Sequence, residues 1–249
     1  MSEAIDLAVI GGTGLYRFPG LEDVERHAVD TPYGHPSDAV VVGRVGTHRV
    51  AFLARHGESH TIPPHRVNYR ANLWALQHIG AHRVIGVNAV GGIRDDMGPR
   101  VLAVPDQIID YTHGRLTSFS DVAGAEVKHI DFSEPYSAGL RRQLLAAAAR
   151  SGIAAVDGGC YGATQGPRLE TRAEIARLRR DGCDLVGMTG MPEAALAREL
   201  ELDYACLAVV ANWAAGCGDE AEISLPEIFA NLEAATAKVP PIIGAVLAG

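Results

Sequence analysis

The segment Gly-Met-Thr-Gly-Met-Pro-Glu, residues 187–193, lies between a short apolar run at 184–186 and a longer apolar run at 204–210. Each apolar run predicts a β-strand. Pro192 and Glu193 predict the start of a helix between them, because proline has no N–H to lose in a first turn and the helix dipole stabilises a carboxylate there. The segment therefore predicts a strand–helix–strand unit of an α/β fold.

Chemically useful side chains follow both of these strands. Met188 and Thr189 come directly after the first strand, and Asn212 stands at the far end of the second. In an open α/β sheet the carboxyl ends of the strands line the ligand crevice. We therefore expect a crevice in which Thr189 offers a hydroxyl to an anion, Met188 an apolar surface, and Asn212 a planar donor–acceptor pair suited to the edge of a base.

Strand and helix patterns alternate along the rest of the chain. Apolar runs predict strands at residues 7–10, 39–42, 49–53, 83–87, 104–111 and 156–161. Helical patterns are found at 68–79, with Trp74 expected in the core, at 140–150, at 172–180 and at 226–247. Thr171 and Glu174 form a capping-box pattern before the third of these helices. The sequence predicts one α/β domain, residues 1–249, with a mixed, largely parallel β-sheet flanked by helices.

The composition excludes several classes of protein. A formal charge of −8 over 249 residues argues against a general nucleic-acid or membrane surface, and a hydrophobic content of 47% suffices for a sizeable core. The sequence has no apolar run of 18 residues and no signal-peptide pattern at its start, so a cytoplasmic protein is expected. Its four cysteines form no C-x-x-C pair, which favours reduced, mostly buried thiols over a disulfide framework or a zinc site.

Two strand ends have the residues of an anion site. The strand at 7–10 runs into Gly-Gly-Thr-Gly at 11–14, a turn that lets the backbone approach an anion closely. The dinucleotide fingerprint is not met, because Arg17 occupies the place of its third glycine. The strand at 49–53 leads to Arg55 and His56. A guanidinium can fork onto phosphate, so Arg55 is a candidate ligand, the alternative being an ordinary polar surface loop.

Three further positions are less specific on local grounds. Asn88 and Ala89 follow the strand at 83–87, where small residues let a ligand press on the backbone. Glu170 precedes the cap of the helix at 172–180, so it belongs to a loop and not to the solvated face of that helix. His129, in a polar segment, fits either a core or a surface histidine.

Five motifs in order, at 10–15, 54–57, 88–92, 166–171 and 187–193, resemble the trimeric purine nucleoside phosphorylase and methylthioadenosine phosphorylase family. The resemblance implies cleavage of a purine nucleoside by inorganic phosphate, without a cofactor or a metal. It also implies a homotrimer with sites near the subunit interfaces.

The resemblance assigns a role to each candidate residue. It implies five phosphate-binding residues: Thr13, Arg55, His56, Ala89 and Thr189. Met188 matches the residue under the ribose, and Glu170 and Asn212 match the base-recognising positions. His129 matches a histidine donated across a subunit interface toward the 5′ end. The implied mechanism has no covalent intermediate: phosphate attacks the anomeric carbon while Glu170 and Asn212 stabilise the departing base.

Departures from the adenine-type members point to a different base. Those members have aspartates at the positions of Asn212 and Ala214 and a serine at that of Glu170, and Asn88 also agrees with the 6-oxopurine branch. Hypoxanthine presents N1–H, which a carboxylate can accept, whereas the unprotonated N1 of adenine would face Glu170 lone pair to lone pair. Leu169 replaces an aromatic residue that stacks on the base in relatives, so the base would either pack on Trp213 or be held more loosely.

The 5′ end points to a methylthio group. Leu225 stands where enzymes for inosine place a histidine, and Ile228 and Phe229 continue an apolar wall like that of methylthioadenosine enzymes. The alternative is that these side chains are the buried stripe of the last helix. Together the two ends of the site imply S-methyl-5′-thioinosine as substrate.

Other functions remain open at this point. They are phosphorolysis of inosine and guanosine, phosphorolysis of methylthioadenosine, hydrolysis by a nucleosidase, and a non-catalytic nucleotide-binding module. A hydrolase has no need of an anion cage, which argues against the third, and the incomplete glycine fingerprint argues against the fourth.

Overall fold

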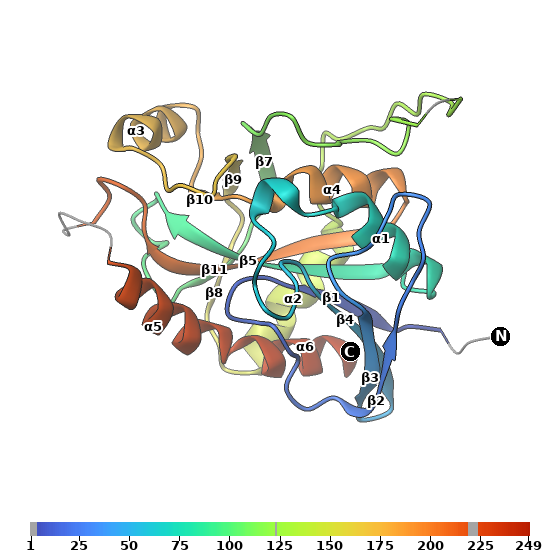
Figure 1. The fold of residues 1–249 in the computed structure, drawn as a ribbon. Coiled ribbons are helices and arrows are strands. Elements are labelled where there is room, and N and C mark those ends of the chain that lie inside the picture. The colour runs from blue at the N-terminus through green and yellow to red at the C-terminus, as the bar shows by residue number, and fades with distance from the viewer. Residues whose placement is uncertain (1–3, 123, 219–223) are drawn as a thin grey trace.

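The computed structural model describes residues 4–122, 124–218 and 224–249. Its centre is a twisted sheet with helices on both faces (Figure 1). The strands of this sheet follow the order β2-β3-β4-β1-β5-β10-β9-β7, and β11 joins β5 to β6, which pairs with β8. The expected α/β class with a mixed, largely parallel sheet is confirmed, since six of the ten strand pairs are parallel.

The strands have these bounds: β1 Leu7–Gly11, β2 Glu22–His27, β3 Val40–Val45, β4 His48–Ala54, β5 Arg83–Gly92, β6 Leu102–Val104, β7 Gln107–Asp110, β8 Ala155–Asp157, β9 Cys160–Ala163, β10 Leu185–Gly187 and β11 Asp203–Trp213. The β1 strand is buried along its whole length between β4 and β5. Its apolar side chains point alternately to the two faces of the sheet, so β1 contributes to the hydrophobic core on both faces.

The helices have these bounds: α1 Tyr69–His78, α2 Ala138–Arg150, α3 Arg172–Arg180, α4 Gly190–Glu199, α5 Leu225–Thr236, α6 Val239–Leu247, and a short 3₁₀ helix Pro64–Arg66. The α1 and α4 helices pack on one face of the sheet, and α2, α5 and α6 pack on the other. The capping box predicted at α3 is present, with Thr171 and Glu174 each bonding the other's backbone N–H.

Several expected elements differ in detail. The helix expected at 226–247 is two helices, because Pro240 and Pro241 lack the N–H groups that a continuous helix would need at these positions. The strand expected at 104–111 is divided into β6 and β7 around Pro105. The exposed, charged β2 strand was not predicted. Trp74 is half-buried and stacks on His78 with ring centroids 4.6 Å apart, so it lies outside the core.

An irregularity near the end of β11 positions one predicted site residue. The β11 strand pairs with β5 in parallel register from Asp203 to Val210, and the register then shifts so that Asn212 stands opposite Gly91. Ala211 is the extra residue of this bulge. A bulge interrupts the strict alternation of side chains. Ala211 and Asn212 consequently line the same cavity although they are consecutive.

The fold leaves no room for a side chain at Gly86 in the centre of β5. A Cβ atom there would lie 2.2 Å from the Tyr204 hydroxyl and 2.8 Å from Glu193 Oε1. We predict that Gly86→Ala lowers the free energy of unfolding by about 1–3 kcal/mol, as measured by urea denaturation, because the Tyr204 ring must move. Gly244→Ala is the control: no atom lies within 4 Å of its Cβ position in α6, and alanine should be neutral or stabilising there. Equal effects would contradict the prediction.

Candidate active site

A cavity of about 570 Å³ opens at the carboxyl ends of the central strands. Thr13 follows β1, Arg55 follows β4, Ala89 lies on β5, Thr189 follows β10, and Asn212 lies on β11. The parallel strands β1, β4, β5 and β11 direct their carboxyl ends to one edge of the sheet, and β10, which runs antiparallel to β5, brings Thr189 beside Asn88 on β5. Thirteen predicted site residues line the cavity: Thr13, Arg55, His56, Ala89, Leu169, Glu170, Met188, Thr189, Asn212, Ala214, Leu225, Ile228 and Phe229.

Three predicted residues do not line this cavity. Asn88 is buried just behind it. The ring of Trp213 packs closely against Gly98 and Gly218, where a larger residue would leave no room for it. Trp213 lines a neighbouring cavity of about 730 Å³. Trp213 thus lies outside this cavity, and the exposed Leu169 lines it instead, so packing of Trp213 on a base stays a prediction. His129 is exposed on the long segment between β7 and α2, away from the cavity of its own chain.

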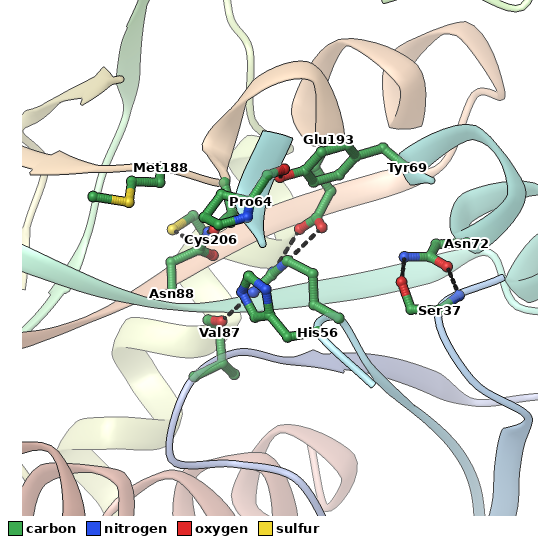
Figure 2. A network of polar contacts seen from close by, with 12 residues as sticks. Ser37, His56, Pro64, Tyr69, Asn72, Val87, Asn88, Met188, Glu193 and Cys206 are labelled. Carbon is green, nitrogen blue, oxygen red and sulfur yellow. Dashed lines mark hydrogen bonds and ion pairs between the residues drawn. The ribbon is translucent and has the colours of Figure 1, made fainter. Parts of the chain in front are cut away.

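Arg55 forms a buried ion pair with Glu193 at the floor of the cavity (Figure 2). Its Nε and Nη2 atoms each donate to one carboxylate oxygen at 2.7 Å, and Nη1 donates to the Val87 carbonyl at 2.9 Å. Both side chains are essentially inaccessible to solvent. Burial by itself lowers the pKa of Arg55, but the charge of Glu193 and its hydrogen bonds outweigh burial and raise that pKa, so the guanidinium stays charged.

The ion pair changes what Arg55 can offer to an anion. The edge of the guanidinium that would fork onto phosphate is already used by Glu193. Arginine has five N–H groups, of which three are engaged in these contacts, so one on Nη1 and one on Nη2 are left. Nη1 also lies 3.0 Å from the Cβ position of Gly12, which shows how closely the glycine turn approaches the guanidinium.

His56 is held in its neutral form beside Arg55. Its Nδ1 donates to the Ile62 carbonyl at 2.8 Å, so Nε2 carries the lone pair. Burial, with the positive charge of Arg55 acting in the same direction, lowers the pKa of His56 to about 4. The His60 ring lies 4.9 Å from that of His56, and burial lowers its pKa as well. At neutral pH this side of the cavity therefore adds no further cation.

Asn88 orients the hydroxyl of Thr189. The Asn88 Nδ2 atom donates to Thr189 Oγ1 at 2.7 Å, and the Cys206 thiol lies 3.5 Å from the Asn88 Oδ1 (Figure 2). Because Oγ1 accepts from the amide, its own proton is left to point into the cavity. Asn88 contacts Thr189 and does not line the cavity itself, whereas the sequence predicted it to contact the substrate directly.

Glu170 and Asn212 form the polar wall of the cavity. Glu170 Oε1 accepts from the Thr164 hydroxyl at 2.6 Å, and Asn212 Nδ2 donates to the Trp213 carbonyl at 2.6 Å. Each side chain is half-buried, and each contact uses only part of its hydrogen-bonding capacity. A carboxylate oxygen and an amide oxygen with a second N–H remain to meet the polar edge of a ligand.

The first turns of α5 form the apolar wall. Leu225 and Phe229 are each 59% exposed, and Ile228 is half-buried beside them. The alternative that these three residues form a buried stripe is thus wrong for Leu225 and Phe229. The buried face of α5 is made by Leu232, Ala235 and Thr236. An apolar side chain exposed at the mouth of a cavity is available to pack on a ligand.

Two charged residues that support the cavity, Glu193 and Arg115, were not predicted as site residues. Glu193 was assigned to the helix dipole, although it is the partner of Arg55. The sequence Ala-Ala-Leu-Ala after Glu193 indicates that this carboxylate lies in a buried helix. A buried carboxylate requires a cation nearby, so the sequence could have predicted an arginine or lysine partner. Arg115 was not singled out at all, because nothing in its polar surroundings distinguishes it from a surface arginine.

Two other classes of site find no support in the part of the chain that the structure describes. No cluster of three or more His, Cys, Asp or Glu side chains could hold a metal ion among those residues. Within the same residues, no helix has the length and apolar character that crossing a membrane requires. All four cysteines are free, and three of them are buried.

The lowered pKa of His56 predicts a loss of stability in acid. Unfolding returns the pKa to its ordinary value of 6.5, so the stabilisation is complete above pH 6.5 and is lost as the pH falls toward 4. Replacing His56 by Asn, whose amide N–H can still reach the Ile62 carbonyl, should remove about 2 kcal/mol of the stability change between pH 7.5 and 5.0 in urea denaturation. An identical pH dependence in His56→Asn and wild type would contradict the prediction, and His82→Asn, at an exposed position, is the control.

Sequence and structure comparisons agree with the motifs. Residues 6–243 match a family profile described as "Phosphorylase superfamily". The chain is 63% identical over 248 residues to a "Probable S-methyl-5′-thioinosine phosphorylase" of Xanthomonas campestris, covering 100% of this chain and 99% of the relative. It is 48% identical to the "6-oxopurine nucleoside phosphorylase" of Pyrococcus furiosus, covering 84% of this chain and 80% of the relative.

A solved structure is also closely similar. Methylthioadenosine phosphorylase from Schistosoma mansoni in complex with adenine superposes with a TM-score of 0.93 at 32% sequence identity, covering 98% of this chain and 91% of that one. The structural similarity covers 98% of this chain and includes all five motifs. The chain belongs to the phosphorylase superfamily.

Proposed function

We propose that the protein cleaves the N-glycosidic bond of S-methyl-5′-thioinosine with inorganic phosphate, giving hypoxanthine and 5-methylthioribose 1-phosphate in purine salvage. One observation carries the proposal. The polar wall of Glu170 and Asn212 and the apolar wall of Leu225, Ile228 and Phe229 line the same cavity. A ligand that fits both walls is a 6-oxopurine nucleoside with an apolar 5′ substituent. The name of the Xanthomonas relative supports the same substrate.

Phosphate is proposed to bind where the strands β1, β4, β5 and β10 end. Its proposed ligands are the residues of the phosphate cage, Thr13, Arg55, His56, Ala89 and Thr189. Thr189 supplies the hydroxyl that Asn88 orients, and Arg55 supplies the N–H groups that Glu193 leaves. Neutral His56 presents Nε2, which accepts a hydrogen bond from a P–OH group of the phosphate. Met188 packs under the ribose.

The proposed chemistry needs no cofactor and no covalent intermediate. A phosphate oxygen attacks the anomeric carbon, the C–N bond to the purine breaks, and its electron pair leaves with the base. The ribose passes through a state with oxocarbenium character. Glu170 accepts the N1–H of hypoxanthine, and the remaining N–H of Asn212 donates toward O6 and N7, where negative charge develops. The departing base then takes up one proton from water to give neutral hypoxanthine. The cage supplies the remaining acceleration by fixing the nucleophile in place.

The alternatives differ from this proposal at single positions. Phosphorolysis of inosine or guanosine requires a partner for a 5′-hydroxyl, and Leu225 offers none. Phosphorolysis of methylthioadenosine puts an unprotonated N1 against Glu170. A nucleosidase would have no use for the phosphate cage. We also infer one domain over residues 1–249 and a cytoplasmic homotrimer, in which the exposed His129 reaches the 5′ end of a neighbouring site.

The proposed function is tested by assaying four nucleosides side by side, with and without phosphate: methylthioinosine, methylthioadenosine, inosine and adenosine. Turnover should require phosphate. Methylthioinosine should exceed inosine in kcat/KM by roughly tens- to hundreds-fold, because burying a hydroxyl without a partner costs about 1–3 kcal/mol and burying the methyl group gains about 0.8 kcal/mol.

Variants at the apolar wall sharpen this test. Leu225→His should narrow the preference for methylthioinosine by favouring inosine, since an imidazole can hydrogen-bond a 5′-hydroxyl. Val24→His, at a similarly exposed apolar position on β2, should leave the ratio unchanged. Equal kcat/KM for methylthioinosine and inosine in the wild type would assign the protein to ordinary inosine phosphorolysis. Equal turnover without phosphate would exclude a phosphorylase.

A further inference from the structure

Arg115 lies in the long segment between β7 and α2, outside the cavity, yet its side chain turns inward. Its neighbours Gly114 and Leu116 are exposed, whereas Arg115 itself is half-buried. The guanidinium lies 5.7 Å from the centroid of the Tyr69 ring, which covers part of one face. Because the charge of Arg115 is partly removed from water, its N–H groups need hydrogen-bond acceptors within the protein.

Every N–H group of Arg115 has an acceptor. Nη1 donates to the carbonyls of Met188 and Met191 at 2.8 and 2.6 Å. Nη2 donates to the carbonyls of Gln165 and Thr164 at 2.9 and 3.2 Å, and Nε donates to the Gln165 side chain at 3.2 Å. These contacts engage all five donors of the guanidinium. Nη1 also lies 3.4 Å from the Tyr69 hydroxyl, so four of the six acceptors are backbone carbonyls, all of them outside the regular ladders of the sheet.

The acceptors belong to the two loops that carry the site. Thr164 and Gln165 follow β9 and begin the loop that ends at Glu170. Met188 follows β10 and directly precedes Thr189, and Met191 lies in the first turn of α4, two residues after Thr189. The two loops already touch through one backbone bond, from Thr164 N–H to the Gly187 carbonyl at 2.8 Å. Arg115 adds contacts to both loops from a third segment, and so fixes one loop relative to the other.

Each loop leads from Arg115 to a proposed substrate contact in one step. Thr164, whose carbonyl accepts from Arg115, donates its hydroxyl to Glu170 at 2.6 Å. Met188, whose carbonyl also accepts from Arg115, is followed directly by Thr189, and the Thr189 hydroxyl is oriented by Asn88. The guanidinium is therefore linked through Thr164 to the carboxylate proposed to meet the base, and through Met188 to the residue whose hydroxyl is proposed to meet phosphate.

We propose that Arg115 is a positioning residue, which sets the separation between the base-binding carboxylate of Glu170 and the phosphate-binding hydroxyl of Thr189. This inference rests on the proposed function, because it assigns Arg115 a part in aligning base and phosphate across the bond that breaks. Phosphorolysis requires the attacking oxygen and the departing base to be held on opposite sides of one carbon. A displacement of about 1 Å between such groups can lower the rate about 100-fold.

Lysine cannot replace this side chain. An ammonium keeps the charge but has three donors on a flexible stem, whereas the planar guanidinium reaches both loops at once. Arg115→Lys should therefore leave at least one of the four carbonyls without its donor. We expect its kcat to fall by about 10- to 100-fold per folded molecule.

The experiment compares the wild-type enzyme with Arg115→Lys and Arg115→Gln. The first readout is kcat with saturating methylthioinosine and phosphate. The second is the rise in melting temperature that inorganic phosphate alone produces, which should fall to less than half in both variants because Thr189 is displaced. Arg70→Lys is the matched control, since Arg70 is a buried arginine that bonds the same segment through the Ser118 carbonyl and touches neither loop. It should keep both values within about twofold of the wild type.

A double-mutant cycle tests the path to Glu170. Thr164→Val removes the hydroxyl bond to Glu170, so the losses in kcat from Thr164→Val and Arg115→Lys should be clearly less than additive. Additive losses would overturn the link between Arg115 and Glu170. Wild-type kcat and a full phosphate-induced rise in melting temperature in Arg115→Lys would overturn the positioning role, as would failure of both Arg115 variants to fold, which would make the residue structural.

Failure of the proposed function would look different. It would be seen in the wild type, as an absence of phosphate-dependent cleavage of any of the four nucleosides. Failure of the inference would be seen in the difference between the wild type and the Arg115 variants.

Discussion

The buried ion pair of Arg55 and Glu193 is the constraint on which the rest of the structure depends. Taking two charges out of water is costly, and the cost is recovered only when the geometry is good and the remaining donors are satisfied. Here the pair is bidentate, Val87 accepts from Nη1, and Tyr204 donates to Glu193 Oε1 at 2.7 Å. These contacts tie the end of β4 to β5, to β11 and to the first turn of α4, so the segments that line the cavity are joined through one polar centre.

The same ion pair sets the electrostatic character of the phosphate cage. Arg55 is neutralised by Glu193, and His56 is neutral above pH 5 because its pKa is about 4. The proposed cage thus holds its anion with oriented donors more than with net charge: hydroxyls of Thr13 and Thr189, backbone N–H groups and the remaining N–H groups of Arg55. Such donors are fixed before the ligand arrives, and fixed dipoles need no reorganisation during the reaction.

Much of the fold and site followed from the sequence because the polar candidates stand directly after apolar runs. The carboxyl ends of the parallel strands β1, β4 and β11 meet at one edge, which is why Thr13, Arg55 and Asn212 were brought together as expected, whereas Thr189 joins them from β10, which runs antiparallel to β5. Partnerships between distant residues were not predictable from local pattern, as the pairing of Glu193 with Arg55 shows. Nor was the bulge at Ala211, because it arises from the mismatch of β11 with β5 and leaves no composition signal.

The two walls of the cavity differ in how completely a single chain builds them. The base and phosphate residues lie on strand ends or beside them, are buried or half-buried, and are held by hydrogen bonds from within the chain. Leu225 and Phe229 are 59% exposed on α5, so a 5′ group resting on them would be covered on one side only. Discrimination between a hydroxyl and a methylthio group depends on excluding water from that group. The proposed contacts to base and phosphate therefore come from residues held within one chain, whereas strong selection at the 5′ end requires a second surface over α5, the part assigned to a neighbouring copy in the proposed homotrimer.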